Sequence, residues 1–216
     1  MRAIIFDLDG TMIDNMMIHH RAWQSKLADY GIEMTLDEVK QRIHGVNIEI
    51  LEREFTGRFS DDERIQIAKE KEEKYRQIIE PDLELVKGLP VLLHELKSYN
   101  TVMGVGSAAP PENIDFVLNS LDLWHYFAAV RHSGDVDRGK PDPQIYEILL
   151  DEMNVDPSNC IIFEDTPTGA LAASKAGCNI IVVTTTHQPS EFSEIPNILK
   201  FIRNFEEISV QSLGTF

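Results

Sequence analysis

The sequence has no long hydrophobic run and little cysteine. None of its apolar segments approaches the ~20 residues that a transmembrane helix needs, and the opening MRAIIFDLDG reaches an aspartate too early to contain the hydrophobic region of a signal peptide. The two cysteines, Cys160 and Cys178, are too few for a disulfide framework and too far apart for a CxxC pair. We therefore expect two buried, unpaired thiols in a cytoplasmic protein that has no membrane partner.

Basic residues are also scarce. The chain of 216 residues has 20 Lys and Arg against 36 Asp and Glu, which gives a formal net charge of -16. Such a charge repels nucleic acid phosphates over long range, so we expect no nucleic acid partner. If the substrate is an anionic phosphate, a divalent metal and a few well-placed cations must overcome this field locally. The hydrophobic content of 43% is that of an ordinary globular protein.

Short apolar runs recur along most of the chain, at residues 3–6, 102–105, 128–130, 161–163 and 180–183. They lack alternation and are rich in β-branched residues, as is typical of strands buried on both faces. Helical patterns lie between them, at residues 90–99, 112–121, 143–153 and 168–176. Strands that alternate with helices predict an α/β fold in which a Rossmann-like, doubly wound parallel sheet has helices on both faces.

Residues 15–80 break this rhythm, because they are helical in pattern throughout. Thr35 with Glu38, and Ser60 with Glu63, fit the capping box that begins a helix. We therefore expect an all-helical cap domain at 15–80, inserted into an α/β core domain formed by 1–14 and 81–216. Such an insert follows the carboxyl end of the first strand. Open α/β sheets bind their ligands at this edge, so the insert can act as a lid.

Polar residues follow three of the expected strands directly. Asp7 and Asp9 end the first strand, Ser107 ends the second, and Glu164 and Asp165 end the fourth. The carboxyl ends of parallel strands meet at one edge of a sheet, so these side chains should lie together. Paired carboxylates can hold a hard cation and divide the roles of nucleophile and acid or base.

A lysine completes this set. Lys140 lies in a loop before a helix, in the run KPDP at 140–143, and supplies a positive charge suited to a phosphoryl oxygen. By itself, the Asp-Gly pair after the first strand is equally typical of a turn. Together with the other strand ends, it predicts a site for phosphate and magnesium.

At this point the chain resembles the haloacid dehalogenase superfamily, in particular its β-phosphoglucomutase-like phosphatases with a helical cap. Four motifs occur in the family's order: FDLDGT, the serine of VGSAAP, the lysine of KPDP, and FEDTPTG. The resemblance implies that Asp7 is the nucleophile, which forms an aspartyl phosphate, and that Asp9 is the acid and base. Dehalogenases of the superfamily lack this second aspartate, so its presence favours phosphate chemistry.

The same resemblance implies the ligands of the site. Ser107 and Lys140 would bind the phosphoryl oxygens. Mg²⁺ would be held by the Asp7 carboxylate, the Asp9 backbone carbonyl and Asp165, and Glu164 would assist through water or directly. The expected substrate-binding positions are Leu8, Ala108, His19, Gly45 and Lys71. Lys71 also lies in a run of alternating charge at 69–74, a pattern that is typical of a solvated helix face.

Two activities remain possible within the family, a phosphatase and a β-phosphoglucomutase. The mutase grips a second phosphate with an arginine where this chain has Ile48, and with a serine, lysine and asparagine where it has Ala109, Pro110 and Pro111. We therefore expect a phosphatase of a small phosphorylated metabolite such as a sugar or polyol phosphate. Substitutes for the mutase groups could come from Arg42, Arg53 or His44.

A third possibility, from another class, is a binding or regulatory module that has kept the fold without catalysis. The complete set of motif residues argues against it. We expect the protein to be a monomer whose partner is a small phosphorylated molecule.

Overall fold

The computed structural model describes residues 3–43 and 45–214. The chain forms two compact units, one of Met1–Asp14 and Glu84–Phe216, the other of Asn15–Leu83. The second junction lies three residues beyond the expected boundary at 80/81, because a 3-10 turn at Glu80–Asp82 continues directly from the last long helix of the inserted unit.

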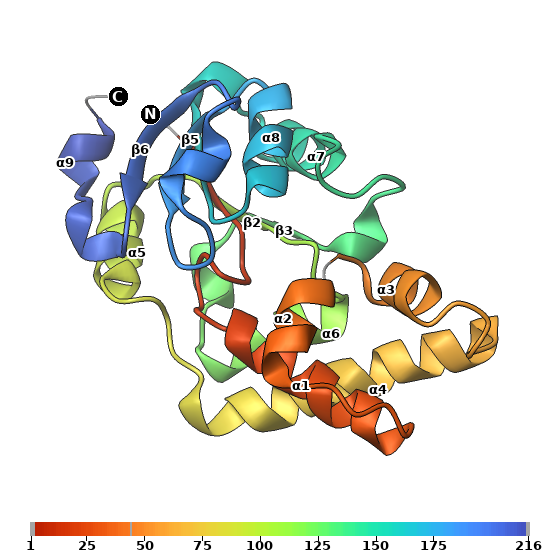
Figure 1. Ribbon diagram of the computed structural model, residues 1–216. Helices are drawn as coiled ribbons and strands as arrows, with labels where there is room; N and C mark the ends of the chain where they lie inside the picture. Colours follow the sequence, from red (N-terminus) through yellow and green to blue (C-terminus); the bar gives the residue numbers. More distant parts are fainter. Residues whose placement is uncertain (1–2, 44, 215–216) are drawn as a thin grey trace. The chain divides into compact units, whose positions relative to one another are not determined.

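The larger unit is built on a six-stranded sheet (Figure 1). Its strands are β1 (Ala3–Phe6), β2 (Met103–Gly106), β3 (Ala129–Arg131), β4 (Cys160–Glu164), β5 (Asn179–Val183) and β6 (Ile198–Ile202). All pair in parallel, in the order β3-β2-β1-β4-β5-β6. The predicted fold class and its first five strands are confirmed. β6 was not predicted, because its sequence, ILKFI, carries a lysine and is only partly buried at an edge of the sheet.

Helices cover both faces of this sheet. Figure 1 shows α7 (Gln144–Met153) and α8 (Pro167–Lys175) on one side, and α5 (Leu89–Ser98) and α9 (Val210–Leu213) on the other. α6 (Pro111–Ser120) follows β2. The four predicted helices start and end within one residue of the observed ones. Proline at the first turn of α5, α6 and α8 suits a helix start, where its missing N–H costs no hydrogen bond.

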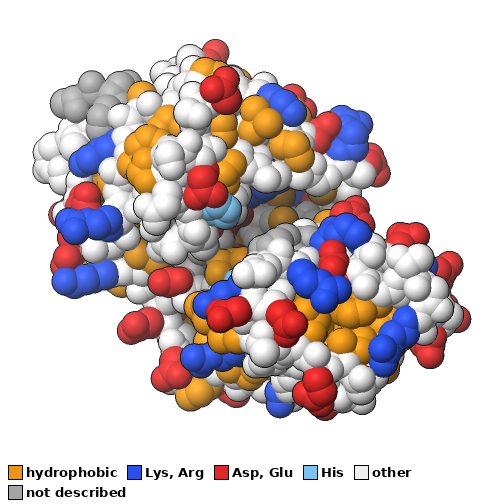
Figure 2. All heavy atoms as spheres, viewed as in Figure 1, with side chains coloured by type: hydrophobic (Ala, Val, Ile, Leu, Met, Phe, Trp, Pro, Cys, Tyr) orange, Lys and Arg blue, Asp and Glu red, His pale blue; other side chains and the backbone are white. Residues whose placement is uncertain are grey.

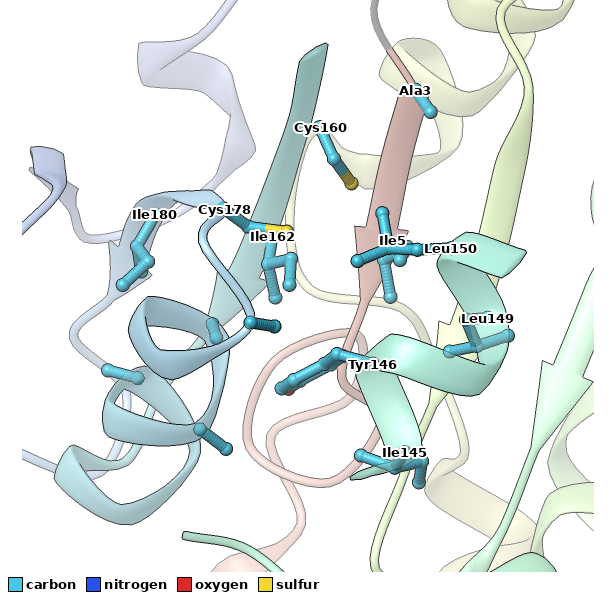
Figure 3. Close-up of a cluster of buried hydrophobic side chains, with 14 of the residues drawn as sticks. Ala3, Ile5, Ile145, Tyr146, Leu149, Leu150, Cys160, Ile162, Cys178 and Ile180 are labelled. Carbon is cyan, nitrogen blue, oxygen red and sulfur yellow. The ribbon is translucent and has the colours of Figure 1, made fainter. Parts of the chain in front are cut away.

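Alternate side chains of the central strands form two cores. On one face Ile5, Ile162 and Ile180 pack against the apolar side of α7 and against α8 (Figure 3). Cys160 and Cys178 lie in this cluster as free, buried thiols, which confirms the expectation. On the other face the rings of Phe6 and Phe163 are stacked, with centroids 5.1 Å apart. The central strands are therefore buried on both sides, and their polar ends are held in fixed positions.

The inserted unit is all-helical, with α1 (Met16–Asp29), α2 (Leu36–Arg42), α3 (Asn47–Glu54) and α4 (Asp61–Ile79). Both predicted capping boxes are present, at Thr35 and at Ser60. This unit has its own apolar core, made of Trp23, Leu27, Ile32, Met34, Val39, Ile43, Ile50, Leu51 and Ile67.

Acidic and basic side chains are interspersed over the face drawn in Figure 2. Within the part of the chain that the structure describes, no helix is both long and apolar enough to span a bilayer.

Candidate active site

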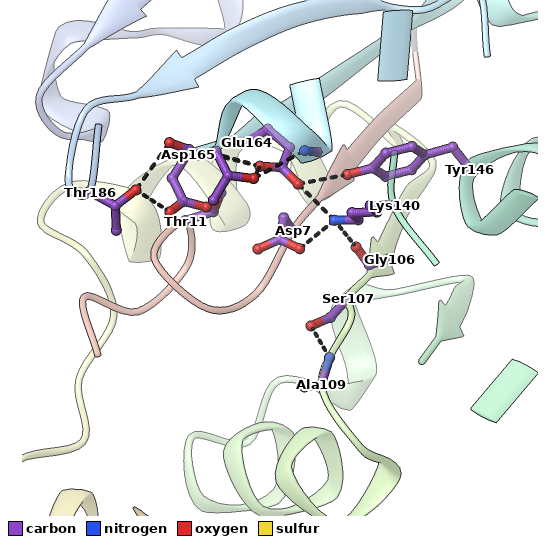
Figure 4. Close-up of polar contacts among 12 residues, drawn as sticks. Asp7, Thr11, Gly106, Ser107, Ala109, Lys140, Tyr146, Glu164, Asp165 and Thr186 are labelled. Carbon is purple, nitrogen blue, oxygen red and sulfur yellow. Dashed lines mark hydrogen bonds and ion pairs between the residues drawn. The ribbon is translucent and has the colours of Figure 1, made fainter. Parts of the chain in front are cut away.

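Polar side chains gather at the carboxyl ends of β1, β2 and β4 (Figure 4). Phe6 is in register with Val105 of β2 and with Phe163 of β4, so Asp7, Ser107 and Glu164 follow at neighbouring positions of one sheet edge. Backbone bonds extend the ladder past the strands: the N–H of Asp7 donates to the carbonyl of Phe163, and that of Ser107 to the carbonyl of Arg131. The structure thus brings together the strand-end residues that the sequence singled out.

Lys140 reaches this edge from the loop before α7. Its ammonium donates to Asp7 Oδ1 at 2.6 Å, to Glu164 Oε1 at 2.7 Å and to the carbonyl of Gly106 at 3.1 Å. Burial alone would lower the pKa of Lys140, but the carboxylates of Asp7 and Glu164 outweigh it and raise that pKa well above its usual value. The lysine therefore remains a cation, held directly beside the predicted nucleophile.

Glu164 is surrounded by donors. Its Oε1 accepts from Lys140 and from the Tyr146 hydroxyl, at 3.1 Å, and its Oε2 accepts from the backbone N–H groups of Asp165 and Thr166 and from the Thr166 hydroxyl. Burial opposes ionisation, yet Lys140 and these bonds leave the pKa of Glu164 below its usual value. A carboxylate so fully bonded is suited to fixing Lys140, and it has little capacity left for a direct metal bond.

Asp165 directly follows β4, the strand that lies between β1 and β5 in the sheet. The Thr11 hydroxyl donates to its Oδ1 at 3.1 Å, and the Thr186 hydroxyl lies against its Oδ2. Gly10, with φ +82°, makes room for it, because a Cβ there would lie 2.2 Å from Asp165 Oδ2. Burial and the charge of Glu164 raise the pKa of Asp165 to about 7.

Asp7 itself is a buried carboxyl group. Burial, with the nearby charges of Glu164 and Asp165, raises its pKa well above the usual value, although Lys140 pulls in the opposite direction. The Ser107 hydroxyl lies at the same edge and accepts from the N–H of Ala109 at 3.1 Å. Asp9 is half-buried, two residues beyond the predicted nucleophile. A cation bound here would favour the ionised form of Asp7.

The two substrate-binding positions expected in the larger unit, Leu8 and Ala108, differ in their exposure to solvent. Leu8 has a fully buried side chain, so only its backbone could meet a ligand. Ala108 is exposed, next to Ser107.

The site also fits a divalent metal. Three buried carboxyl groups, Asp7, Glu164 and Asp165, face one lysine, Lys140, whose side chain is 7% exposed. With all three ionised, these four side chains carry an excess of two negative charges. Among residues 3–43 and 45–214, no three His, Cys, Asp or Glu side chains form a ready-made metal cage. Mg²⁺ needs none, because it is commonly held by one or two carboxylates together with other oxygens and water. Asp7 and Asp165, with the Asp9 carbonyl, would supply such a set.

In the helical unit the structure brings His19 and Lys71 together. Lys71 Nζ lies 2.8 Å from His19 Nδ1, and the His19 ring is stacked on Tyr75 at 3.9 Å. Lys71 also forms an ion pair with Glu72 at 2.8 Å, and its side chain is only 3% exposed. The alternative of a solvated helix face is therefore wrong for Lys71, because the charge pattern does not reveal which side of α4 is buried.

Gly45 lies at a turn with φ +104° before α3, where it is exposed. Asn47, two residues later, donates to Glu72 Oε1 at 2.7 Å, which connects this turn to the pair of Lys71 and Glu72. Of the candidate substitutes for the mutase arginine, Arg42 and Arg53 both bind Glu54 in the structure. His44 lies outside the described residues.

Three residues of the site were given no role from the sequence: Tyr146, Thr186 and Gly169. Tyr146 lies in an apolar helix pattern, where a core role is the ordinary reading. Thr186 follows β5 at the same sheet edge, and this position was the available signal. Gly169 is required by contact, since a Cβ there would lie 1.6 Å from Glu164 Oε1.

Comparison with known proteins agrees with this geometry. Residues 4–183 match the family model of haloacid dehalogenase-like hydrolases. The chain belongs to this family. The haloacid dehalogenase-like fold accounts for the parallel sheet, and the protein is accordingly a hydrolase.

Relatives within the haloacid dehalogenase-like family include enzymes named as phosphatases. The chain is 29% identical to validoxylamine A 7'-phosphate phosphatase of Streptomyces hygroscopicus subsp. limoneus, over 92% of this chain and 93% of that protein. It is 31% identical to 6-phosphogluconate phosphatase of Escherichia coli, over 82% and 80%. The crystal structure of β-phosphoglucomutase from Clostridium difficile is similar with a TM-score of 0.84 and 26% identity, over 100% of this chain and 96% of that one.

Proposed function

We propose that the protein is a Mg²⁺-dependent phosphatase that hydrolyses the monophosphate ester of a small metabolite such as a sugar or polyol. The observation that carries the proposal is the Lys140 ammonium, on a side chain only 7% exposed, which is bonded both to Asp7 and to Glu164 at the edge where Ser107 also lies. This arrangement supports a role of Asp7 as the nucleophile, beside a cation that can neutralise a phosphoryl group. The names of the two phosphatase relatives support the same reaction class.

The reaction divides into two transfers. In the first, an oxygen of Asp7 attacks phosphorus in line, the bond to the ester oxygen breaks, and Asp9 gives that oxygen a proton. In the second, Asp9 takes a proton from a water that attacks the phosphorus of the aspartyl phosphate, which releases inorganic phosphate and restores Asp7. Lys140 and Ser107 would bind the phosphoryl oxygens throughout and stabilise the charge that develops on them.

Asp7, the Asp9 carbonyl and Asp165 would hold the magnesium ion, with Glu164 acting through Lys140 or through water. When bound, Mg²⁺ neutralises phosphoryl charge and favours the ionised nucleophile. Asp165 is fixed for this role by Thr11 and Thr186.

The polar cluster of the helical unit supports an uncharged leaving group. We propose that His19, Gly45 and Lys71 contact this part of the substrate. The charge of Lys71 is largely balanced by Glu72, so the cluster offers hydrogen bonds more than a site for a second phosphate. A hydroxyl-rich sugar or polyol matches these donors and acceptors.

β-Phosphoglucomutase is the second candidate, favoured by the structural similarity and by the contact of His19 with Lys71. A mutase must also bind a second phosphate and exclude water while the sugar turns around. Here Ile48 is an exposed apolar side chain, and Pro110 and Pro111 begin α6 without N–H donors. These residues support hydrolysis over transfer to a second hydroxyl.

The experiment that separates the candidates supplies β-glucose 1-phosphate with catalytic β-glucose 1,6-bisphosphate, alongside a panel of sugar and polyol phosphates, all with Mg²⁺. We expect free phosphate from at least one ester to form much faster than glucose 6-phosphate. Glucose 6-phosphate that forms far faster than phosphate from any ester would establish the mutase. No turnover of any kind would favour a non-catalytic module.

A further inference from the structure

Tyr146 joins the hydrophobic core to the polar site. It lies in the first turn of α7 with its ring fully buried among apolar side chains (Figure 3). Its hydroxyl reaches the sheet edge and donates to Glu164 Oε1 at 3.1 Å (Figure 4). The Lys140 ammonium lies 4.9 Å from the centroid of the same ring, within the range of a cation–π interaction.

The hydroxyl shares its acceptor with the phosphate-binding lysine. Glu164 Oε1 accepts hydrogen bonds from both Tyr146 and Lys140. Lys140 in turn donates to both Glu164 and Asp7. Donation by the phenol neutralises part of the negative charge on Oε1, so it weakens the pull of Glu164 on the ammonium. The phenol therefore favours the position of Lys140 beside Asp7.

The backbone of β2 accommodates this arrangement. A Cβ at Gly106 would lie 3.3 Å from Tyr146 Cε1 and 2.7 Å from Leu149 Cδ1, so a larger residue would displace the Tyr146 ring or the Leu149 side chain. The carbonyl of the same Gly106 accepts the third Lys140 bond, at 3.1 Å. One residue thus admits the aromatic ring and also holds the lysine.

We propose that Tyr146 is a positioning residue for phosphoryl transfer, which sets the place of Lys140 between Glu164 and Asp7 through its hydroxyl and its ring. This inference rests on the proposed phosphatase function. In a purely structural role, the hydroxyl would only need a hydrogen-bond partner because it is buried. Its removal would then change the stability of the protein without changing the position of Lys140.

The test replaces the hydroxyl and keeps the ring, with Tyr146→Phe. We expect kcat to fall about tenfold while KM changes by less than about twofold, since the lost bond is to a charged group that acts in the transition state. Tyr126→Phe is the matched control. Lys97 Nζ lies 5.0 Å from the centroid of the Tyr126 ring, so this variant also removes a hydroxyl from a ring in contact with a lysine. Tyr126 lies outside the four sequence motifs.

A second measurement does not depend on turnover. In protein labelled with ¹⁵N-lysine, the buried Lys140 ammonium should give a resolved signal, identified by its loss in Lys140→Met. We expect this signal to shift or broaden in Tyr146→Phe and to stay in place in Tyr126→Phe.

The two measurements separate two kinds of failure. A wild-type protein that hydrolyses no ester would overturn the phosphatase, while the lysine signal would still decide the positioning role. An unmoved lysine signal, or wild-type kcat in a folded Tyr146→Phe, would overturn the positioning role alone.

Discussion

Gly169 lies so close to Glu164 that a Cβ on the glycine would be 1.6 Å from the carboxylate Oε1. Gly169 belongs to the first turn of α8, and its N–H donates to the Thr166 hydroxyl that also binds Glu164. The start of this helix therefore fixes the carboxylate that holds Lys140.

We expect Gly169→Ala to push Glu164 out of place. Turnover should fall by about 10²-fold, as small displacements of catalytic groups can cause, and the free energy of unfolding should fall by about 1–3 kcal/mol through overpacking. Steady-state kinetics and urea unfolding measure both. Gly139→Ala is the control, because a Cβ there meets no atom within 4 Å; equal activity in the two variants would show that the contact is unimportant.

Sequence reasoning reached most of this site because strand ends in a parallel sheet converge. The apolar pattern of the sequence reveals each buried strand. The positions of Asp7, Ser107 and Asp165 then follow from counting residues to the end of that strand. Tyr146 and Gly169 could not be found in this way, because their roles arise from contacts between helices and strands far apart in the chain. Similarly, β6 has a mixed, half-buried pattern, and Lys71 is buried by packing that its charged neighbours conceal.

The buried pair of Lys71 and Glu72 gives a stability test in the helical unit. Glu72→Gln leaves the buried lysine without its anion, and breaking a buried ion pair typically costs about 3–5 kcal/mol. We expect a lower midpoint in urea unfolding for this variant. Glu73→Gln, at the exposed next position, should change the free energy of unfolding by no more than about 0.5 kcal/mol. The ion pair would be irrelevant if both variants unfolded alike.

Magnesium binding should depend on pH through Asp165. The pKa of Asp165 is raised from the usual 3.8 to about 7, so the folded protein favours the protonated acid. The contribution of this group to the free energy of unfolding is therefore lost as pH rises from 3.8 through 7. Mg²⁺ requires the carboxylate and reverses this loss. We expect the increase in Tm caused by Mg²⁺ to be larger at about pH 8 than at about pH 6.

Thermal unfolding with and without Mg²⁺ measures this difference, and Asp165→Asn should show little increase at either pH. An equal increase at both pH values in the wild-type protein would contradict the role of Asp165.

Removal of the metal should abolish turnover. We expect excess EDTA to stop release of phosphate from a chromogenic ester, and added Mg²⁺ to restore it, because Lys140 alone leaves the site with excess negative charge. Full activity in EDTA would refute a metal requirement.

The central claim is that Asp7 becomes covalently phosphorylated. The most direct measurement mixes the enzyme with a ³²P-labelled ester, quenches in acid within one turnover, and identifies the labelled peptide by mass spectrometry. We expect an acid-stable, base-labile phosphoryl group on Asp7, and neither label nor turnover in a folded Asp7→Asn. Label on another residue, or normal turnover in Asp7→Asn, would contradict the account.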